Sequence, residues 1–258
     1  MTPNLKGKYQ YVLRLFDNYF NWYEILTARI LNRSISNIQL RNGIKILGGP
    51  KSEIVGISDE IFIQKIYNPY FLEIKKGDTV IDIGANIGVF SLFAAYKGAE
   101  KIIAVEPLPK NIVLIKKNFK ENNLNPPTPI QAAVSGTKRQ AKLYLGDSDS
   151  HNLLFDHNYR NEKYKKYIMV PTITLAGILD GNRIAKVDFL KVDCEGSEGG
   201  IIKTAPASVW KKIKKIAIEY HDGVSSLTSA EIAAKLRKIG YKVAIKRIDS
   251  NFGYIYAF

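Results

Sequence analysis

Two glycines and two acidic residues have the spacing found where a parallel strand turns into a helix beside a ligand. In the segment VIDIGANIG an apolar stretch ends at Asp82, and Gly84 and Gly88 follow. A second apolar stretch ends at Glu106, eighteen residues after Gly88. Gly84 permits a sharp turn, and Gly88 lets the next helix pack closely on the strand. An acid at the end of the second strand can accept both hydroxyls of a ribose. The pattern therefore predicts a site for a nucleoside-bearing cofactor.

The residue in the middle of this turn distinguishes between two classes of cofactor. A dinucleotide site requires G-x-G-x-x-G, because the second glycine admits the pyrophosphate. Asn86 replaces that glycine here, and Asp82 adds negative charge beside it. S-adenosylmethionine carries an amino group and a sulfonium and has no phosphate, so the turn favours it over a nicotinamide dinucleotide.

The next apolar stretch, TPIQAAVSG, places two small residues at the end of a third strand. We expect Ala132 and Ala133 to leave room there for an adenine ring. Ordinary close packing explains either alanine equally well.

A second group of charged residues follows in VDFLKVDCEGSE. If this strand continues, Lys191, Asp193 and Glu195 face one side and Cys194 faces the other. Charges at the end of a buried strand are costly unless they are paired or functional. We therefore expect a catalytic role for these three residues, with Asp193 also close to the methionine part of the cofactor.

The fifth strand ends in AIEYHD, which places Glu219 and His221 on a common face beside the same crevice. An alcohol that accepts a methyl group must lose its proton, and a general base assists this step. His221 and Asp193 are the candidate bases. A carboxylate acceptor would need no base, only a cationic positioning group such as Lys191.

These residues require a framework of alternating strands and helices. Such alternation, with continuous apolar strands, predicts a mostly parallel sheet with helices on both faces. The C-terminal YKVAIKRIDSNFGYIYAF predicts two antiparallel strands, and the polar stretch 145–168 predicts a surface loop. The expected strands lie near 79–83, 101–106, 128–134, 187–193 and 214–220, and the expected helices near 88–97, 109–122, 174–180, 197–204 and 228–239.

The first seventy residues predict a separate cap on a domain formed by residues 71–258. Helical spacing of apolar residues predicts one helix over 9–31, packed on its own domain rather than on a membrane surface or a dimer partner. Asn42-Gly43 predicts a hairpin in which both turn residues have positive φ. A short helix is expected to begin at Ser58 or Asp59 and to end at Asn68-Pro69. We expect residues 1–50 to shape the pocket for the acceptor.

Composition limits the remaining possibilities. The 258 residues are 46% hydrophobic, which is enough for one sizeable core. The single cysteine, Cys194, excludes an intrachain disulfide and favours a reducing, cytoplasmic setting. No apolar stretch approaches the length of a membrane span. The net charge of +14 indicates either an anionic partner, such as an anionic acceptor or a membrane surface, or simply a basic solvated surface.

Several of these segments together resemble one family. VIDIGANIGVFSLFAA, AVEPLPKNIVLIKKN, QAAVSG, VPTITL and FLKVDCEGSE, in this order, are similar to the FkbM-type S-adenosylmethionine-dependent methyltransferases. The similarity extends over roughly residues 55 to 221. It implies a Rossmann-like seven-stranded sheet and O-methylation of a hydroxyl or carboxyl on a sugar, glycan precursor or polyketide.

The resemblance also implies roles for particular residues. Asp193 and Glu195 match the D-x-E-G-x-E segment that lies near the transferred methyl group. Tyr67 lies in EIFIQKIYNPYFLEIKKGD, which resembles the segment that precedes the first strand of the family. The implied cofactor-binding residues are Tyr67, Asp82, Gly84, Asn86, Gly88, Glu106, Ala133 and Asp193.

Two alternatives are left open. The first is an RNA methyltransferase, which the basic charge would suit. We expect RNA not to be the acceptor, because Asp-Cys-Glu-Gly stands where base-amine methylases carry Asn/Asp-Pro-Pro-aromatic. The second is a non-catalytic cofactor-binding or glycan-binding module. No metal site is predicted, and the sequence leaves open whether a divalent ion bridges Asp193 and Glu195. It also leaves open the oligomeric state.

Overall fold

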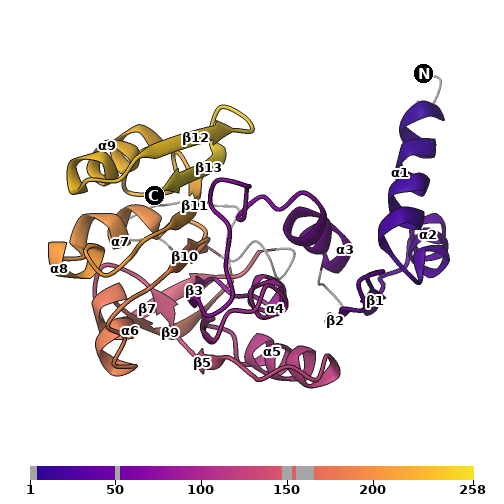
Figure 1. Ribbon diagram of the computed structural model, residues 1–258, viewed down its shortest axis with the longest axis horizontal. Coiled ribbons are helices and arrows are strands. Elements are labelled where there is room, and N and C mark those ends of the chain that lie inside the picture. The colour runs from indigo at the N-terminus through magenta and orange to yellow at the C-terminus, as the bar shows by residue number, and fades with distance from the viewer. Residues whose placement is uncertain (1–4, 50–52, 147–152, 155–165) are drawn as a thin grey trace.

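The centre of the protein is a sheet of seven strands. The computed structural model describes residues 5–49, 53–146, 153–154 and 166–258. The strand order is β12-β13-β11-β10-β3-β4-β5 (Figure 1). β13 is antiparallel to both of its neighbours, and the other pairs are parallel. The expected mostly parallel sheet is confirmed. Its strands are β3 (Thr79–Ile83), β4 (Lys101–Val105), β5 (Thr128–Ile130), β10 (Phe189–Val192), β11 (Ile216–His221), β12 (Val243–Arg247) and β13 (Phe252–Ala257).

Helices cover both faces of this sheet, and each face has its own hydrophobic cluster. Val80 packs in the cluster that contains Phe93 and Phe119, whereas its neighbour Ile81 packs in the cluster that contains Ile178 and Leu236. Consecutive strand residues point to opposite faces, so a strand buried on both sides is continuously apolar, as the sequence shows. The helices are α4 (Val89–Tyr96), α5 (Pro109–Glu121), α6 (Leu175–Gly181), α7 (Glu198–Thr204), α8 (Ala207–Trp210) and α9 (Ser229–Ile239).

A second sheet lies beside the first and was not expected. The predicted strand 128–134 divides into β5 and β6 (Ala133–Val134). β6 pairs with β9 (Tyr167–Ile173), followed in order by β7 (Gln140–Tyr144) and β8 (Leu153–Leu154). The predicted loop 145–168 is therefore wrong at Leu153–Leu154 and at the start of β9, and most of its remainder lies outside the described residues.

The single helix predicted over 9–31 is wrong. The chain forms α1 (Leu5–Asn18) and α2 (Trp22–Ile30), and α1 projects from the body of the molecule (Figure 1). The break occurs because Tyr19 forms a β-bridge with Leu40, and because the Asn21 side chain accepts the backbone N–H of Gln39 at 2.9 Å. Long-range bonds thus replace the helical ones. Half of the apolar residues at helical spacing are exposed, namely Phe16, Tyr23 and Ile30, whereas Val12 and Leu26 are half-buried and Tyr19 is buried.

The hairpin is present, but its turn differs from the prediction. β1 (Asn37–Gln39) and β2 (Lys45–Leu47) pair antiparallel through a longer loop. Gly43 has a φ of +91°, and Asn42 does not adopt positive φ. The Gly43 N–H donates to the carbonyl of Leu40, and the Leu40 N–H donates to the carbonyl of Ile44. This is a three-residue loop with glycine in the left-handed position, the next most common hairpin geometry.

The short helix after the hairpin begins earlier than expected. α3 (Ile54–Ser58) continues directly into η1 (Asp59–Ile63), one turn of π-helix that ends well before Asn68-Pro69. Ser58 and Asp59 lie within this helical run and do not cap it. Both are buried and bond to the hydroxyl of Tyr19 at 2.7 Å, which fixes α3 and η1 against α1.

Candidate active site

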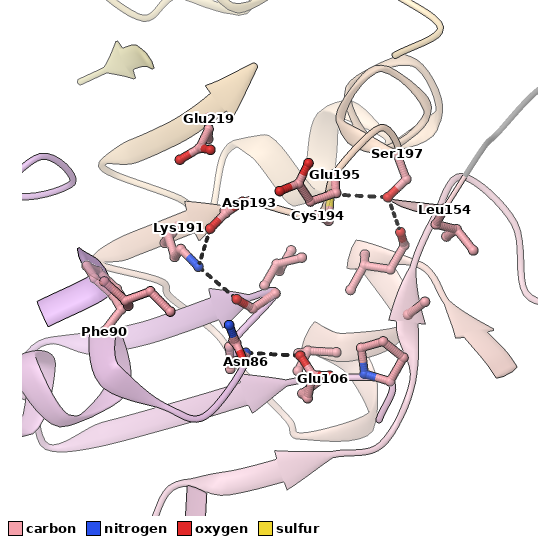
Figure 2. A pocket seen from close by; sticks show the side chains of 18 of the residues that line it. Asn86, Phe90, Glu106, Leu154, Lys191, Asp193, Cys194, Glu195, Ser197 and Glu219 are labelled. Atoms are coloured by element: carbon pink, nitrogen blue, oxygen red, sulfur yellow. Dashed lines mark hydrogen bonds and ion pairs between the residues drawn. The ribbon is translucent and has the colours of Figure 1, made fainter. Parts of the chain in front are cut away.

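A cavity of about 480 Å³ opens at the carboxyl ends of β3, β4, β10 and β11. These strands are parallel, so their ends meet at one edge of the sheet, and β3 and β10 flank the point where the strand order reverses. Such a switch point is where open α/β sheets bind ligands. Asp82 and Gly88 do not line the cavity. The predicted site residues that do line it are Tyr67, Gly84, Asn86, Glu106, Ala133, Lys191, Asp193, Glu195 and His221 (several labelled in Figure 2).

The turn after β3 passes directly against the end of β10. A Cβ atom on Gly84 would lie 1.6 Å from the carbonyl oxygen of Asp193, and the φ of Gly84 is +74°. Glycine is thus required by contact as well as by conformation. Gly88 lies at the start of α4 with a φ of +86°, and a Cβ there would meet Ile115 of α5 at 3.0 Å, so the close packing at this glycine is against α5 and not against the strand. Asn86, with a φ of +49°, lines the cavity.

Glu106 joins this turn to the end of β4. Its Oε2 accepts the backbone N–H of Asn86 at 3.0 Å, and its Oε1 accepts Leu108 N at 3.0 Å and the Asn111 side chain at 3.1 Å. A carboxylate offers about four lone-pair sites, so Oε2 retains one for a ligand. Burial raises the pKa of Glu106 to about 7, although the three donors oppose the increase.

The carboxylate of Asp82 is paired with another side chain of the protein and does not line the cavity. Lys191 is the register partner of Asp82 in the neighbouring strand, and its ammonium lies 3.2 Å from Asp82 Oδ1 and 3.1 Å from Asp193 Oδ2. Ser91 donates to the other Asp82 oxygen at 2.7 Å, and Lys191 also donates to Gly84 O at 2.9 Å. Burial alone lowers the pKa of Lys191, but the two carboxylates outweigh it and hold this pKa well above its usual range. Asp82 thus positions Lys191, which positions Asp193.

His221 is surrounded by carboxylates. Its Nε2 lies 3.3 Å from Glu195 and 3.5 Å from Glu219, and its Nδ1 lies 3.3 Å from Glu198. Burial would lower the pKa of His221, but these carboxylates raise it to about 12. The imidazole is therefore protonated near neutral pH. A protonated ring has no lone pair for an acceptor's proton, so this arrangement does not favour the expected role of His221 as a base.

Tyr67 connects the chain before β3 to this cluster. Its hydroxyl bonds to Asp193 at 3.0 Å and to Glu219, and its ring packs edge-on against Phe90 and Tyr254. Burial, together with the two carboxylates, raises the pKa of Tyr67 well above its usual range. Tyr67 is thus neutral and contacts two acids with one hydroxyl proton. Burial raises the pKa of Glu219, so a protonated Glu219 can donate to the Tyr67 oxygen while Tyr67 donates to Asp193.

The turn after β10 replaces the strand continuation on which the parity argument depended. β10 ends at Val192, and Glu195 and Gly196 have φ of +51° and +114°. Glu195 still reaches the cavity, but Cys194 lines it as well, with Ser197 donating to its sulfur at 3.1 Å. Cys194 also packs against the hydrophobic cluster that contains Ile83 and Val192, whereas Lys191 lies over the rings of Tyr67 and Phe90 in the other cluster.

Two further acids were not assigned roles by sequence reasoning. Glu198 is fully buried at the start of α7, accepts the Gly196 N–H and contacts His221. It is the last acid of D-C-E-G-S-E, and that position was the available signal. Glu219 was placed on the face of His221 by strand parity, and the structure adds its bond to Tyr67.

The strand order and the cavity at the switch point define a Rossmann-like α/β protein, and the comparisons with known proteins agree. The sequence profile of the methyltransferase FkbM domain matches residues 82–243. The chain therefore belongs to the FkbM family and is a methyltransferase.

The individual relatives have low sequence identity to this chain but align with most of it. The chain is 26% identical over 240 residues to 31-O-demethyl-FK506 methyltransferase FkbM of Streptomyces tacrolimicus, covering 83% of this chain and 91% of the relative. It is 25% identical over 237 residues to Methyltransferase 1 of Beauveria bassiana, covering 83% and 92%. The crystal structure of methyltransferase FkbM from Methylobacillus flagellatus aligns with a TM-score of 0.50 at 16% identity, over 76% of this chain and 49% of that one, and shows a shared fold. Within the described part of the chain, no helix is long and apolar enough to cross a membrane.

Proposed function

We propose that the protein binds S-adenosylmethionine and methylates a hydroxyl oxygen of a small-molecule or glycan acceptor. The observation that carries this proposal is the cavity itself, because it joins a Glu106 oxygen that keeps one lone pair at one end to Asp193, Glu195 and Glu219 at the other. Its volume of about 480 Å³ lies within the range of small-ligand pockets. When bound, the cofactor supplies an electrophilic methyl group on a positively charged sulfur.

The cavity residues fit this cofactor. Glu106 accepts a ribose hydroxyl on its remaining lone pair, and Ala132 and Ala133 leave space beside it for the adenine. Asp193 faces the cationic methionine end. Lys191 and Tyr67 hold the Asp193 carboxylate in place, and Asp82 acts through Lys191 without touching the ligand.

The charge of the lining supports a hydroxyl acceptor over a carboxylate. Among the described residues, acidic side chains outnumber cationic ones around the cavity, in contrast to the chain's net charge of +14. Burial raises the pKa values of Glu60, Glu106 and Glu195 to about 7, 7 and 8, so part of this lining is protonated near neutral pH. Both lining cations are nevertheless already paired with acids of the protein, which disfavours a carboxylate acceptor. The acidic lining residues are Glu53, Glu60, Glu106, Asp193, Glu195 and Glu219, and the cationic ones are Lys191 and His221.

Glu195 is the best placed group to take a hydrogen bond from the acceptor. Asp193 is engaged by Lys191 and Tyr67, whereas His221 is the ion-pair partner of Glu195 among the described residues, and the Glu195 side chain is 20% exposed. Burial raises the pKa of Glu195 to about 8, so it accepts such a bond most readily above this pH. The protein's main contribution is to orient an acceptor oxygen in line with the methyl–sulfur bond, since such positioning supplies up to ~7–11 kcal/mol.

Calorimetry with S-adenosylhomocysteine tests the cofactor half of the proposal. Replacing Glu106 by Gln should weaken binding by ~1–3 kcal/mol, because a buried charged acceptor is lost. The affinity of the wild-type protein should also fall as pH decreases through about 7, where Glu106 gains a proton, and this dependence should be absent in Glu106→Gln. The exposed Glu100→Gln should behave as wild type. Binding of NADH without binding of S-adenosylhomocysteine would refute the cofactor assignment.

Transfer of labelled methyl groups tests the acceptor half. Label should enter free sugars or lipid-linked glycans and be stable to mild base, as an ether is and an ester is not. Base-labile label would indicate a carboxylate acceptor and contradict the charge argument.

A further inference from the structure

One end of the cavity gathers two carboxylates and an imidazole in the manner of metal ligands. One oxygen each from Glu195 and Glu219 and one ring nitrogen of His221 lie within 4.8 Å of one another. The Nε2 atom of His221 is 3.3 Å from Glu195 Oε2 and 3.5 Å from Glu219 Oε1. Ligands about 2.1 Å from a tetrahedral ion are about 3.4 Å apart. The two separations from His221 Nε2 are therefore close to the edge of such a tetrahedron.

The other nitrogen of His221 is held as metal-binding histidines are held. Nδ1 lies 3.3 Å from Oε1 of Glu198, which is fully buried and fixed by the N–H of Gly196. Metal-ligating histidines almost always donate their second N–H to such a group, which fixes the tautomer and leaves the first nitrogen for the ion. This contact is independent of the spacing of the three ligands.

The charges of the cluster are also compatible with a further cation. Lys191 and His221 are the cationic partners of five carboxylates in the described ion pairs, namely Asp82, Asp193, Glu195, Glu198 and Glu219. Several of these acids are buried, and an uncompensated buried charge is costly. A divalent ion that displaces the Nε2 proton of His221 would add positive charge at the point where the carboxylates of Glu195 and Glu219 approach this nitrogen.

We propose that Glu195, Glu219 and His221 form a binding site for a divalent first-row transition metal. Imidazole and carboxylate together favour ions such as Mn²⁺, Fe²⁺ or Zn²⁺ over Mg²⁺ and Ca²⁺, which prefer oxygen ligands alone. Three protein ligands leave coordination positions open toward the cavity.

The site lies at the opposite end of the cavity from Asn86 and Glu106 (Figure 2). An acceptor hydroxyl could occupy an open position, and the ion would then favour its deprotonated form. This role rests on the proposed function, whereas metal binding itself does not.

Electron paramagnetic resonance of Mn²⁺ tests the site on the metal-stripped full chain. We expect one ion per chain, displaced by Zn²⁺. Pulsed measurements should show coupling to an imidazole nitrogen, and His221→Gln should abolish that coupling. Glu195→Gln should weaken Mn²⁺ binding about tenfold or more, and Glu198→Gln about 10–100-fold through the histidine. Glu60→Gln removes a carboxylate from the same cavity outside the cluster and should leave binding nearly unchanged.

S-adenosylhomocysteine binding, measured on the same samples, shows that each variant is folded and separates this inference from the proposed function. The inference is overturned if the cofactor product binds but Mn²⁺ and Zn²⁺ do not. It is also overturned if Mn²⁺ binds without nitrogen coupling, or equally well to Glu195→Gln. Metal binding without binding of the cofactor product would support the site and count against the proposed function.

Discussion

Single residues around the cavity are mostly bonded to one another before any ligand arrives. Asp82 is committed to Lys191 and Ser91, and Asp193 to Lys191 and Tyr67. Each bond fixes a rotamer, so the carboxylates that face the cavity are pre-positioned. Pre-positioning of this kind is what in-line group transfer requires.

Gly84 provides a sharp test at this scale. A methyl group there would meet the Asp193 carbonyl at 1.6 Å, a backbone contact that no side-chain movement relieves. Gly84→Ala should abolish detectable S-adenosylhomocysteine binding and lower the melting temperature. Gly77→Ala is the matched control, because Gly77 has a similar φ of +85° with nothing within 4 Å of its added Cβ. It carries only the left-handed penalty of about 1–2 kcal/mol. Equal losses of stability in the two variants would contradict the close approach of the turn to β10.

At the scale of elements, the N-terminal region reaches the cavity indirectly. Residues 5–49 contribute nothing to its described lining, whereas residues 53–67 do, from α3, η1 and the segment that follows. We propose that residues 1–70 act as one cap on residues 71–258, with α1 and the hairpin supporting α3. A single hydrophobic cluster extends from Leu15 and Tyr19 to Val80 and Phe90, which couples this cap to the sheet.

Removal of the Tyr19 hydroxyl tests whether α1 and the hairpin support α3. It bonds to Ser58 and to the buried Asp59, so Tyr19→Phe leaves the carboxylate with one partner fewer and should destabilise the fold by ~1–3 kcal/mol. Movement of η1 should raise the KM for the acceptor more than it alters the affinity for S-adenosylhomocysteine. Urea unfolding and steady-state kinetics measure the two effects. Tyr23→Phe removes an exposed hydroxyl from α2 and should change neither. An unchanged acceptor KM in Tyr19→Phe would separate the cap from the acceptor site.

At the scale of the molecule, the sign of the charge differs between the exterior and the cavity. The chain carries a net +14, yet carboxylates dominate the cavity lining that the structure describes. The basic charge therefore belongs to the outer surface, where it can attract polyanions without bringing them to the reacting atoms.

This separation leads to a prediction for RNA. Bulk RNA should bind at low salt and dissociate steeply as salt increases, because phosphate contacts release counterions. It should nonetheless receive no methyl label, since a phosphate-bearing acceptor would meet like charge in the cavity. Filter binding measures the first effect, and nuclease treatment of labelled product measures the second. Nuclease-sensitive label formed at catalytic rates would establish the RNA methyltransferase alternative.

Patterns between near neighbours in the chain were sufficient for much of the architecture. Continuous apolar runs predicted β3, β4, β10 and β11, because a strand buried on both faces needs no polar residue. Two glycines and Glu106 predicted the ligand turn, because left-handed backbone and a strand-end acid are local requirements. The break between α1 and α2 was missed, because it is decided by bonds from Tyr19 and Asn21 to β1 and the residue after it, which are distant in sequence. The second sheet was missed as well.

The partners of the charged residues were decided by tertiary structure alone. The sequence placed Asp82 beside a cofactor, but the register of β3 against β10 sets it opposite Lys191. Likewise, parity brought His221 to the crevice, but the turn after β10 brings Glu195 and Glu198 around it. Strand parity determines which face a side chain takes, whereas strand register and turn geometry determine what it meets there. Because the protonation of a buried group depends on its neighbours, the sequence determined which residues gather at this site, and only the fold decided which of them carry a proton.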